Sequence, residues 1–251
     1  MKESKKRYMN ELRENLLLRM INKRKIIRIG TPGDYYPFSC RRDEEPEGID
    51  IDLLRNFAAY AGFSLKFVST TWDRILDDLL RGSFDIAAGG VAISKQRRKR
   101  ALFSATYFRT GKAPLTLAKN AHRYSTFEEI DRPGVRVIVN PGGTNEHFAR
   151  KRLQKATLVV HIDNITVFEK ILSGEADVMI TDAVEAVVQE DKNPLLKAVN
   201  PMKPFTCSHF AFMLGENEQY LKEVLDAWLV GHGRQGGIKK IIFRWTGRSI
   251  L

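Results

Sequence analysis

The chain has 251 residues, of which 43% are hydrophobic and 28% charged, a composition typical of a soluble protein with one large domain or two lobes. No apolar run approaches the roughly 18–20 residues of a membrane span, and none near the N-terminus is long enough for a secretory signal. Residues 1–28 contain ten basic and three acidic residues and carry +7 of the net charge of +11, which argues against a nucleic-acid-binding face spread over the fold.

The first half of the chain predicts strands and helices in alternation. Apolar residues at helical spacing, separated by charges, predict an N-terminal helix over 8–21. The segments that follow read β-α-β-α-β, the order typical of a parallel sheet covered by helices. They are strands at 26–30, 65–69 and 84–88 and helices at 53–61 and 72–80.

A second α/β unit follows a connection with a short helix at 94–100 and a strand at 113–118. The sequence Ser125-Thr-Phe-Glu128 predicts a capping box before another short helix. The second unit and the C-terminal part contain strands at 135–139, 157–161, 176–180 and 208–213 and helices at 144–153, 164–173, 182–190, 216–230 and 237–245. Two such units predict two lobes around a cleft, with ligands bound at the carboxyl ends of the strands.

The stretch from Val137 to Phe148 is the most informative of these strand ends. A buried strand runs into Pro-Gly-Gly, and Thr144 opens a helix. Such a helix start leaves backbone N–H groups unpaired, and these groups attract anions. The same sequence also fits an ordinary strand-to-helix turn, and it lacks the spacing and the lysine of a phosphate loop.

The cysteines and histidines give no sign of a metal or redox site. Cys40 and Cys207 lie too far apart for a CxxC pattern; the sequence leaves a disulfide open, with two free thiols as the default. None of the five histidines has metal-ligand spacing. We expect no metal site and no cofactor.

Two sets of motifs stand out along the chain. The first set is Gly30-Thr-x-x-x-Tyr35-x-Pro-Phe38, Gly48-Ile-Asp-Ile-Asp52, Phe84-Asp-Ile-Ala, and Arg97 with Phe103-Ser104. The second set is Gly33-Asp-Tyr-x-Pro-Phe38, Thr71-Trp72, Gly111-Lys112-x-Pro114, Val137-Ile-Val-Asn-Pro-Gly-Gly-Thr-Asn-Glu146 and Thr181-Asp-Ala-Val-Glu185-Ala. The first set resembles the type II periplasmic amino-acid-binding proteins, and the second set resembles the cyclohexadienyl dehydratases, which convert prephenate to phenylpyruvate and arogenate to phenylalanine.

The resemblance covers nearly the whole chain and implies an α/β fold of two lobes, the type II periplasmic-binding-protein fold. Each lobe is then a mostly parallel sheet flanked by helices, and two crossing strands join the lobes at a hinge that closes on the ligand. Residues 8–115 and 205–251 would form lobe one, residues 116–204 lobe two, and residues 1–7 a basic N-terminal extension.

The resemblance also implies a reaction of phenylalanine biosynthesis, catalysed by a carbon–oxygen lyase. The ring carboxylate of the substrate leaves as CO2, and the C4 hydroxyl leaves as water. Glu185 holds the family's proton-donor position, and burial would keep it protonated; its spacing from Asp182 alone also fits an exposed helix glutamate. Lys112 and Asn140 complete the implied catalytic set, although Lys112 by itself also fits an exposed strand start.

The other implied site residues bind the substrate. Arg97 would bind a ligand carboxylate through two parallel hydrogen bonds, and Asp182 would pair with the amino group of arogenate. Tyr35 and Trp72 sandwich the ring and exclude water, although as residues alone they also fit a core. The remaining implied contacts are Gly90, Gly142, Gly143, Thr144 and Asn145.

Two positions depart from the amino-acid-binding proteins. Ala92 replaces a ligand-bonding Ser, and Pro32 replaces the acid found in proteins that bind basic amino acids. Both changes argue against a simple cationic-amino-acid binder. The alternative function is a non-catalytic amino-acid or carboxylate solute-binding protein of an ABC transporter that uses the same cleft.

The expected partners are the small-molecule substrates prephenate and arogenate, with no nucleic acid and no membrane span. The resemblance implies a periplasmic protein; because the chain shows no signal peptide, we expect a cytoplasmic one if the chain is complete. The sequence leaves open which of the two substrates is preferred, and it leaves the oligomeric state open from monomer to trimer.

Overall fold

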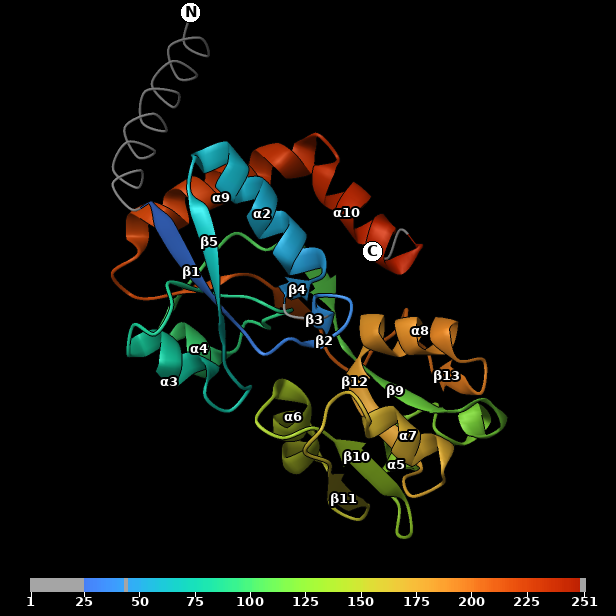
Figure 1. The fold of residues 1–251 in the computed structure, drawn as a ribbon. Coiled ribbons are helices and arrows are strands. Elements are labelled where there is room, and N and C mark those ends of the chain that lie inside the picture. Colours follow the sequence, from blue (N-terminus) through green and yellow to red (C-terminus); the bar gives the residue numbers. More distant parts are fainter. Residues whose placement is uncertain (1–24, 43–44, 249–251) are drawn as a thin grey trace, which may run out of the picture.

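The computed structural model describes residues 25–42 and 45–248 and shows two α/β lobes (Figure 1). Each lobe contains a five-stranded sheet with helices packed against it. The expected two-lobed fold is confirmed. The helix expected over 8–21 and the extension expected at 1–7 lie outside the described residues.

The first sheet is mostly built from the N-terminal half of the chain. Its two longest strands are parallel, and the strand that returns from the C-terminal part pairs antiparallel with its neighbours. In spatial order the strands are β5 (Ser64–Ser69), β1 (Ile26–Thr31), β6 (Ile86–Ala87), β15 (Met213–Leu214) and β7 (Leu102–Phe103).

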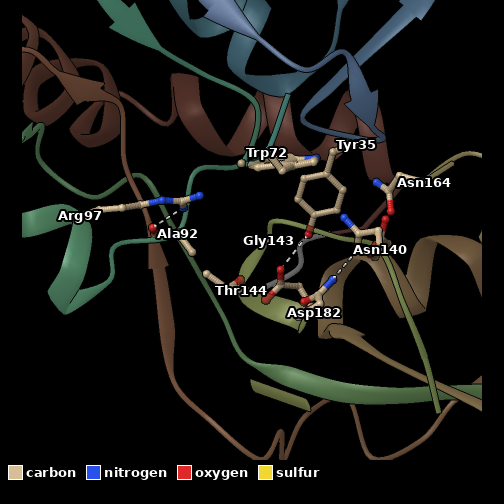
Figure 2. A pocket seen from close by; sticks show the side chains of 12 residues that line it. Tyr35, Trp72, Ala92, Arg97, Asn140, Gly143, Thr144, Asn164 and Asp182 are labelled. Carbon is tan, nitrogen blue, oxygen red and sulfur yellow. Dashed lines mark hydrogen bonds between the residues drawn. The ribbon is translucent and has the colours of Figure 1, made fainter. Parts of the chain in front are cut away.

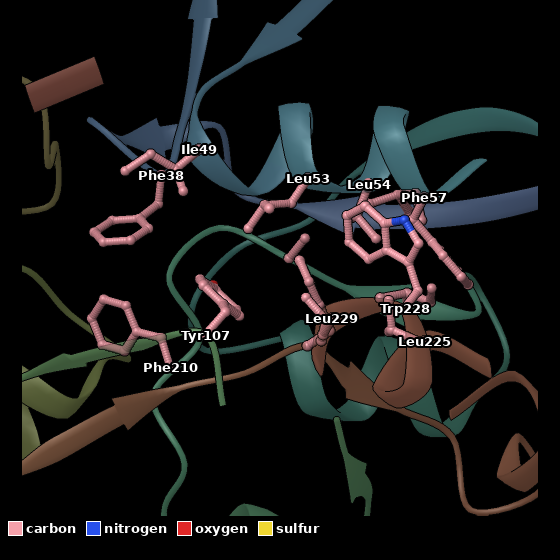
Figure 3. Packing of buried hydrophobic residues seen from close by; sticks show 14 of the residues in the cluster. Phe38, Ile49, Leu53, Leu54, Phe57, Tyr107, Phe210, Leu225, Trp228 and Leu229 are labelled. Atoms are coloured by element: carbon pink, nitrogen blue, oxygen red, sulfur yellow. The ribbon is translucent and has the colours of Figure 1, made fainter. Parts of the chain in front are cut away.

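Helix α2 (Ile49–Ala61) covers this sheet together with helices from the C-terminal part (Figure 1). It ends because Gly62 adopts a left-handed conformation with φ of 77°, which a residue without a side chain reaches at little cost. Phe57 of α2 packs on Trp228 of α9 (Gln219–Arg234), with ring centroids 5.5 Å apart (Figure 3). The other helices of this lobe are α3 (Ile75–Leu80), α4 (Lys95–Arg98), α9 (Gln219–Arg234) and α10 (Gly237–Thr246).

The second sheet combines parallel and antiparallel pairs. In spatial order its strands are β11 (Thr157–Val160), β10 (Arg136–Val139), β12 (Val178–Asp182), β9 (Lys112–Leu117) and β13 (Leu196–Ala198). β10 runs parallel to β11 and β12, whereas β9 runs antiparallel to β12 and β13. The helical segments of this lobe are η1 (Ala118–Arg123), α5 (Phe127–Ile130), α6 (Thr144–Arg152), α7 (Val167–Leu172) and α8 (Ala183–Lys192). Among the described helices, none is long and apolar enough to cross a membrane.

Two short strands connect the lobes. β8 (Phe108–Thr110) and β14 (Ser208–Phe210) pair antiparallel and form a two-stranded ribbon of their own. All of β9 belongs to the second sheet, although the expected boundary of lobe one falls at residue 115. We therefore propose that the first crossing ends at Gly111, while the other expected boundaries stay as proposals.

Three local features differ from the sequence-based expectations. The strand expected at 208–213 is two strands, β14 and β15, because the chain passes from the connecting ribbon into the first sheet. The capping box uses Thr126 and Glu129, one residue later than expected. A small sheet of β2 (Asp34–Tyr35), β3 (Ser39–Arg42) and β4 (Glu45–Glu47) was not expected, since its turn-rich sequence conceals it. Cys40 and Cys207 are thiols that form no disulfide with each other, which agrees with the default expectation.

Candidate active site

A cavity lies between the lobes, where strand ends and loops of both sheets meet (Figure 2). All the site residues expected from the sequence line it except Lys112 and Gly142, and Ala92 and Asn164 complete its wall. The lining residues are Tyr35, Trp72, Gly90, Ala92, Arg97, Asn140, Gly143, Thr144, Asn145, Asn164, Asp182 and Glu185.

Glu185 is buried at the start of α8, with 2% of its surface exposed. β12 ends at Asp182, which is the N-cap residue of α8, so Glu185 falls in the first helical turn beside the cavity. Burial raises the pKa of Glu185 to about 8, a hydrogen bond from the Thr181 hydroxyl works against this rise, and the charge of Asp182 adds to it. Glu185 is therefore a carboxylic acid that holds its proton near neutral pH.

Lys112 stands behind the cavity wall and holds several of its residues together. The ammonium group is 3.0 Å from Asp182 Oδ1, and the side chains are only 3% and 6% exposed. The same group donates to Thr144 Oγ1 at 2.9 Å and to Asn145 Oδ1. Tyr35 from the other lobe donates to Asp182 Oδ2 at 3.1 Å (Figure 2). Asp182, expected to receive a ligand's amino group, already has a cation and a phenol as partners.

The start of α6 lies at the cavity, and its first backbone N–H groups have no hydrogen-bond partner among the described residues. No described side chain caps this helix, whose N-cap residue is Gly143, and Gly143, Thr144 and Asn145 all line the cavity. Gly142 was expected to donate to a ligand as well, but its N–H donates to Glu146 Oε2 at 2.7 Å. The anion-binding end of the helix therefore begins one residue later than expected.

Gly142 serves the contact between the lobes instead. Its φ is 76°, a left-handed conformation that favours glycine. A Cβ atom at this position would lie 2.5 Å from the backbone nitrogen of Asp73 in the other lobe. Only a residue without a side chain allows this approach.

Arg97 brings a buried positive charge to the cavity. Ser94 caps α4 by accepting from the Arg97 N–H, which fixes the start of this short helix. The guanidinium donates to the Ala92 carbonyl at 3.1 Å and makes no ion pair with any acidic residue in the described part of the chain. Burial lowers the pKa of Arg97 to about 10, so it remains charged at neutral pH. A buried cation without an acidic partner is a strong site for a ligand carboxylate.

Tyr35 and Trp72 form adjoining walls and do not sandwich a ring as expected. Their rings meet edge to face, with centroids 6.0 Å apart and an interplanar angle of 76° (Figure 2). The Trp72 indole N–H donates to Asp34 Oδ1 at 2.9 Å. A flat ring would therefore contact the two aromatic residues on different sides of a corner.

Several residues support the site although the sequence assigned them no role in it. Thr181 binds Glu185, Asp34 orients Trp72, and Asn164 lies in the wall itself. Asp50 is fully buried and accepts from the N–H groups of Gly89 and Gly90 at 2.7 and 2.9 Å, which shapes the turn that carries Gly90. Their position at the ends of predicted strands was the available signal for Asp34, Asn164 and Thr181.

Comparisons with known proteins agree with this architecture. A family model described as "Bacterial extracellular solute-binding proteins, family 3" matches residues 27–248. A cyclohexadienyl dehydratase of Pseudomonas aeruginosa is 42% identical over 88% of this chain and 82% of its own length. The structure of an ancestral amino-acid-binding protein, described as a precursor of cyclohexadienyl dehydratase, covers 91% of this chain and 99% of its own, with a TM-score of 0.83 and 33% identity. An ancestral cyclohexadienyl dehydratase is 42% identical, with a TM-score of 0.58, over 92% of this chain and 96% of its own.

Proposed function

The chain belongs to the bacterial extracellular solute-binding proteins of family 3 and, within them, to the cyclohexadienyl dehydratases, and we propose that its cavity converts prephenate to phenylpyruvate and arogenate to L-phenylalanine. Such an enzyme is a carbon–oxygen lyase of phenylalanine biosynthesis. The reaction joins loss of CO2 to loss of water and produces an aromatic ring.

The buried acid Glu185 is the observation that carries the proposal. Hydroxide is a poor leaving group, so elimination of the C4 hydroxyl needs a proton donor. A carboxyl group with a pKa of about 8 supplies this proton at neutral pH, whereas an ordinary glutamate would be ionised. Burial and the neighbouring Asp182 both support this protonated state.

The cationic features of the cavity suit the two carboxylates of the substrate. Arg97 has a free guanidinium face and no described acidic partner, and the backbone donors of Gly143 and Thr144 lie at the positive end of α6. Asn140 lines the same wall and offers its carboxamide to a carboxylate or a hydroxyl. These groups would hold the substrate with its C4 hydroxyl toward Glu185.

The proposed step is a decarboxylative elimination. The bond between C1 and the ring carboxylate breaks, CO2 leaves, and the electron pair enters the ring. The C4–O bond breaks with its electron pair on oxygen, which takes the proton of Glu185 and departs as water. The aromatic walls at Tyr35 and Trp72 exclude bulk water, which strengthens the electrostatic interactions inside the cavity.

The alternative of a non-catalytic amino-acid binder is less well supported. An α-ammonium group would meet Asp182, whose carboxylate is already bound by Lys112 and Tyr35. Ala92 also lines the cavity where a hydroxyl donor would help to bind an amino acid. Both residues favour a ligand that is recognised mainly through its carboxylates.

A turnover assay tests the proposal. Purified protein is incubated with prephenate, and phenylpyruvate is followed by its absorbance in base. We expect formation well above the spontaneous rate, and Glu185→Gln should lose activity by about 10²–10⁴-fold while it still binds substrate. Absence of enzymatic product would refute the activity, and full turnover by the variant would refute the role of Glu185.

The compartment is a separate proposal. The matched family is described as extracellular, which favours the periplasm for this protein. Expression in the native cell followed by release of periplasmic contents by osmotic shock should recover the dehydratase activity in the released fraction. Activity confined to the spheroplasts would place the protein in the cytoplasm.

A further inference from the structure

Asn164 is a cavity residue that the proposed reaction leaves without a role. It lies in the segment between β11 and α7, is 5% exposed and lines the cavity. Figure 2 shows its side chain on the same side of the cavity as Tyr35 and Asn140. Its position at the end of a parallel strand is where ligand-binding residues gather in such sheets.

The two ends of the Asn164 carboxamide have different environments. The Nδ2 group donates to the backbone carbonyl of Asp34 in the other lobe at 2.9 Å. The Oδ1 atom is fully buried and has no hydrogen-bond partner among the described residues. The amide orientation is set by the Asp34 contact, because a flipped amide would place two acceptor oxygens against each other. Asn164, which lines the cavity, therefore keeps a buried acceptor that no described group occupies.

An unpaired buried acceptor is unfavourable unless a ligand supplies a donor. Prephenate offers a single hydrogen-bond donor, the C4 hydroxyl, because its two carboxylates and its ketone only accept. Arogenate has the same hydroxyl and an ammonium group in addition. The C4 hydroxyl is thus the donor that both substrates share.

We infer that Asn164 Oδ1 accepts a hydrogen bond from the C4 hydroxyl of the substrate; this inference rests on the proposed function. This hydrogen bond orients the C4 hydroxyl so that its hydrogen points toward Asn164 Oδ1. A lone pair of the hydroxyl oxygen then faces the acid proton of Glu185. After the C4–O bond breaks, the same acceptor holds a hydrogen of the departing water. Asn164 positions the leaving group, and the proton itself comes from Glu185.

A pair of ligands that differ by one hydroxyl tests this role without turnover. Dissociation constants of 4-hydroxyphenylpyruvate and phenylpyruvate are measured by calorimetry for the wild type and for Asn164→Ala. We expect the wild type to bind the hydroxylated ligand about 5–20-fold more tightly, as for one net hydrogen bond, and Asn164→Ala to bring the ratio near one. Asn164→Leu, which fills the volume without an acceptor, should give the same ratio, and thermal melts confirm that both variants fold.

Arg248→Ala is the matched control, because it removes a contact between the lobes without removing an acceptor from the cavity. Arg248 pairs with Asp191 of α8 outside the cavity and also joins the two lobes. This variant should change both dissociation constants by the same factor and keep the wild-type ratio. If Asn164→Ala behaves in the same way, Asn164 is only a contact between the lobes and the inference is overturned.

Two further outcomes also count against the inference. A wild-type protein with no preference for the hydroxylated ligand overturns it. A loss of kcat/KM for arogenate alone in Asn164→Ala overturns it as well, since the oxygen would then bind the ammonium group. Because the ligand ratio requires no turnover, its result is independent of the prephenate assay that tests the proposed function.

Discussion

Tyr35 and Asp182 belong to different lobes and are joined by a hydrogen bond of 3.1 Å across the cavity. Burial and the charges of Asp182 and Glu185 raise the pKa of Tyr35 well above its ordinary value, so the phenol remains a donor over the working pH range. A second contact, from Lys192 to the ring of Tyr36 at 3.3 Å, joins the lobes farther out. The lobes are therefore in contact at the cavity and also away from it.

The activity should decline on the alkaline side because Glu185 must be protonated. Its pKa of about 8 predicts that kcat/KM for prephenate is steady near pH 7 and falls about tenfold per pH unit above 8. Initial rates from pH 6 to 10 check this. A rate that stays constant up to pH 10 would exclude Glu185 as the proton donor.

The same carboxyl group should make the stability of the free protein depend on pH. Its folded pKa lies above its unfolded value of about 4.3, so its contribution to stability is fully present below pH 4.3 and is lost as the pH rises through 8. Relative to Glu185→Gln, which does not titrate, the wild type should lose stability between about pH 5 and 8.

Urea unfolding at several pH values measures that difference. Asp50, whose pKa burial raises to about 6, is present in both proteins and its contribution cancels. Parallel pH curves for the two proteins would contradict the assignment.

Lys112 and Asp182 should show strong coupling in stability. Each is less than 10% exposed, so Lys112→Met leaves a buried carboxylate without its cation and should destabilise the fold by about 3–5 kcal/mol. In Lys112→Met with Asp182→Asn the charge is gone, and the new amide oxygen can still accept from Tyr35. We expect a coupling energy of about 1–3 kcal/mol from the double-mutant cycle; additive effects would show that the two residues do not interact.

Gly142 should be required for the lobes to approach each other closely enough to form an active cavity. In Gly142→Ala the new methyl group collides with the Asp73 backbone, so kcat/KM should fall on the order of 10–100-fold as the geometry of the cavity is disturbed. Gly174→Ala is the control, because Gly174 has the same φ of 76° with open space around it. The control should lose about 1 kcal/mol of stability from its backbone conformation and keep its activity. Equal activities of the two variants would argue that the Asp73 contact has no role.

Sequence motifs predicted the family, the two-lobed fold and the dehydratase activity, and the comparisons confirm these three expectations. The roles of individual site residues remain predictions. Motifs place residues in the cleft because strand ends converge there, but they do not say which polar group takes which partner. The Glu146 carboxylate accepts a hydrogen bond from the Gly142 N–H, and Lys112 donates to Asp182. Both contacts depend on side-chain conformations, which the spacing of residues in the sequence does not determine.

Asn164 is another residue whose hydrogen-bond partner could not be predicted from the sequence. Its partner is a main-chain carbonyl 130 residues away in sequence, and a main-chain group leaves no trace in residue identity. The position of Asn164 after a strand therefore does not predict its contact, which becomes visible only when the fold places Asp34 beside it.

The Asp50 carboxylate joins the glycine turn at the cavity to the segment that leads into the first connecting strand. It accepts from Gly89 and Gly90 at the cavity and from the Tyr107 hydroxyl at 2.6 Å, and Tyr107 directly precedes the first crossing strand. One carboxylate therefore holds both the turn that carries Gly90 and the residue before the first connecting strand. A substitution that removes the Tyr107 hydroxyl would take away one hydrogen bond of the carboxylate that holds the Gly90 turn, so a residue outside the cavity is coupled to the cavity wall.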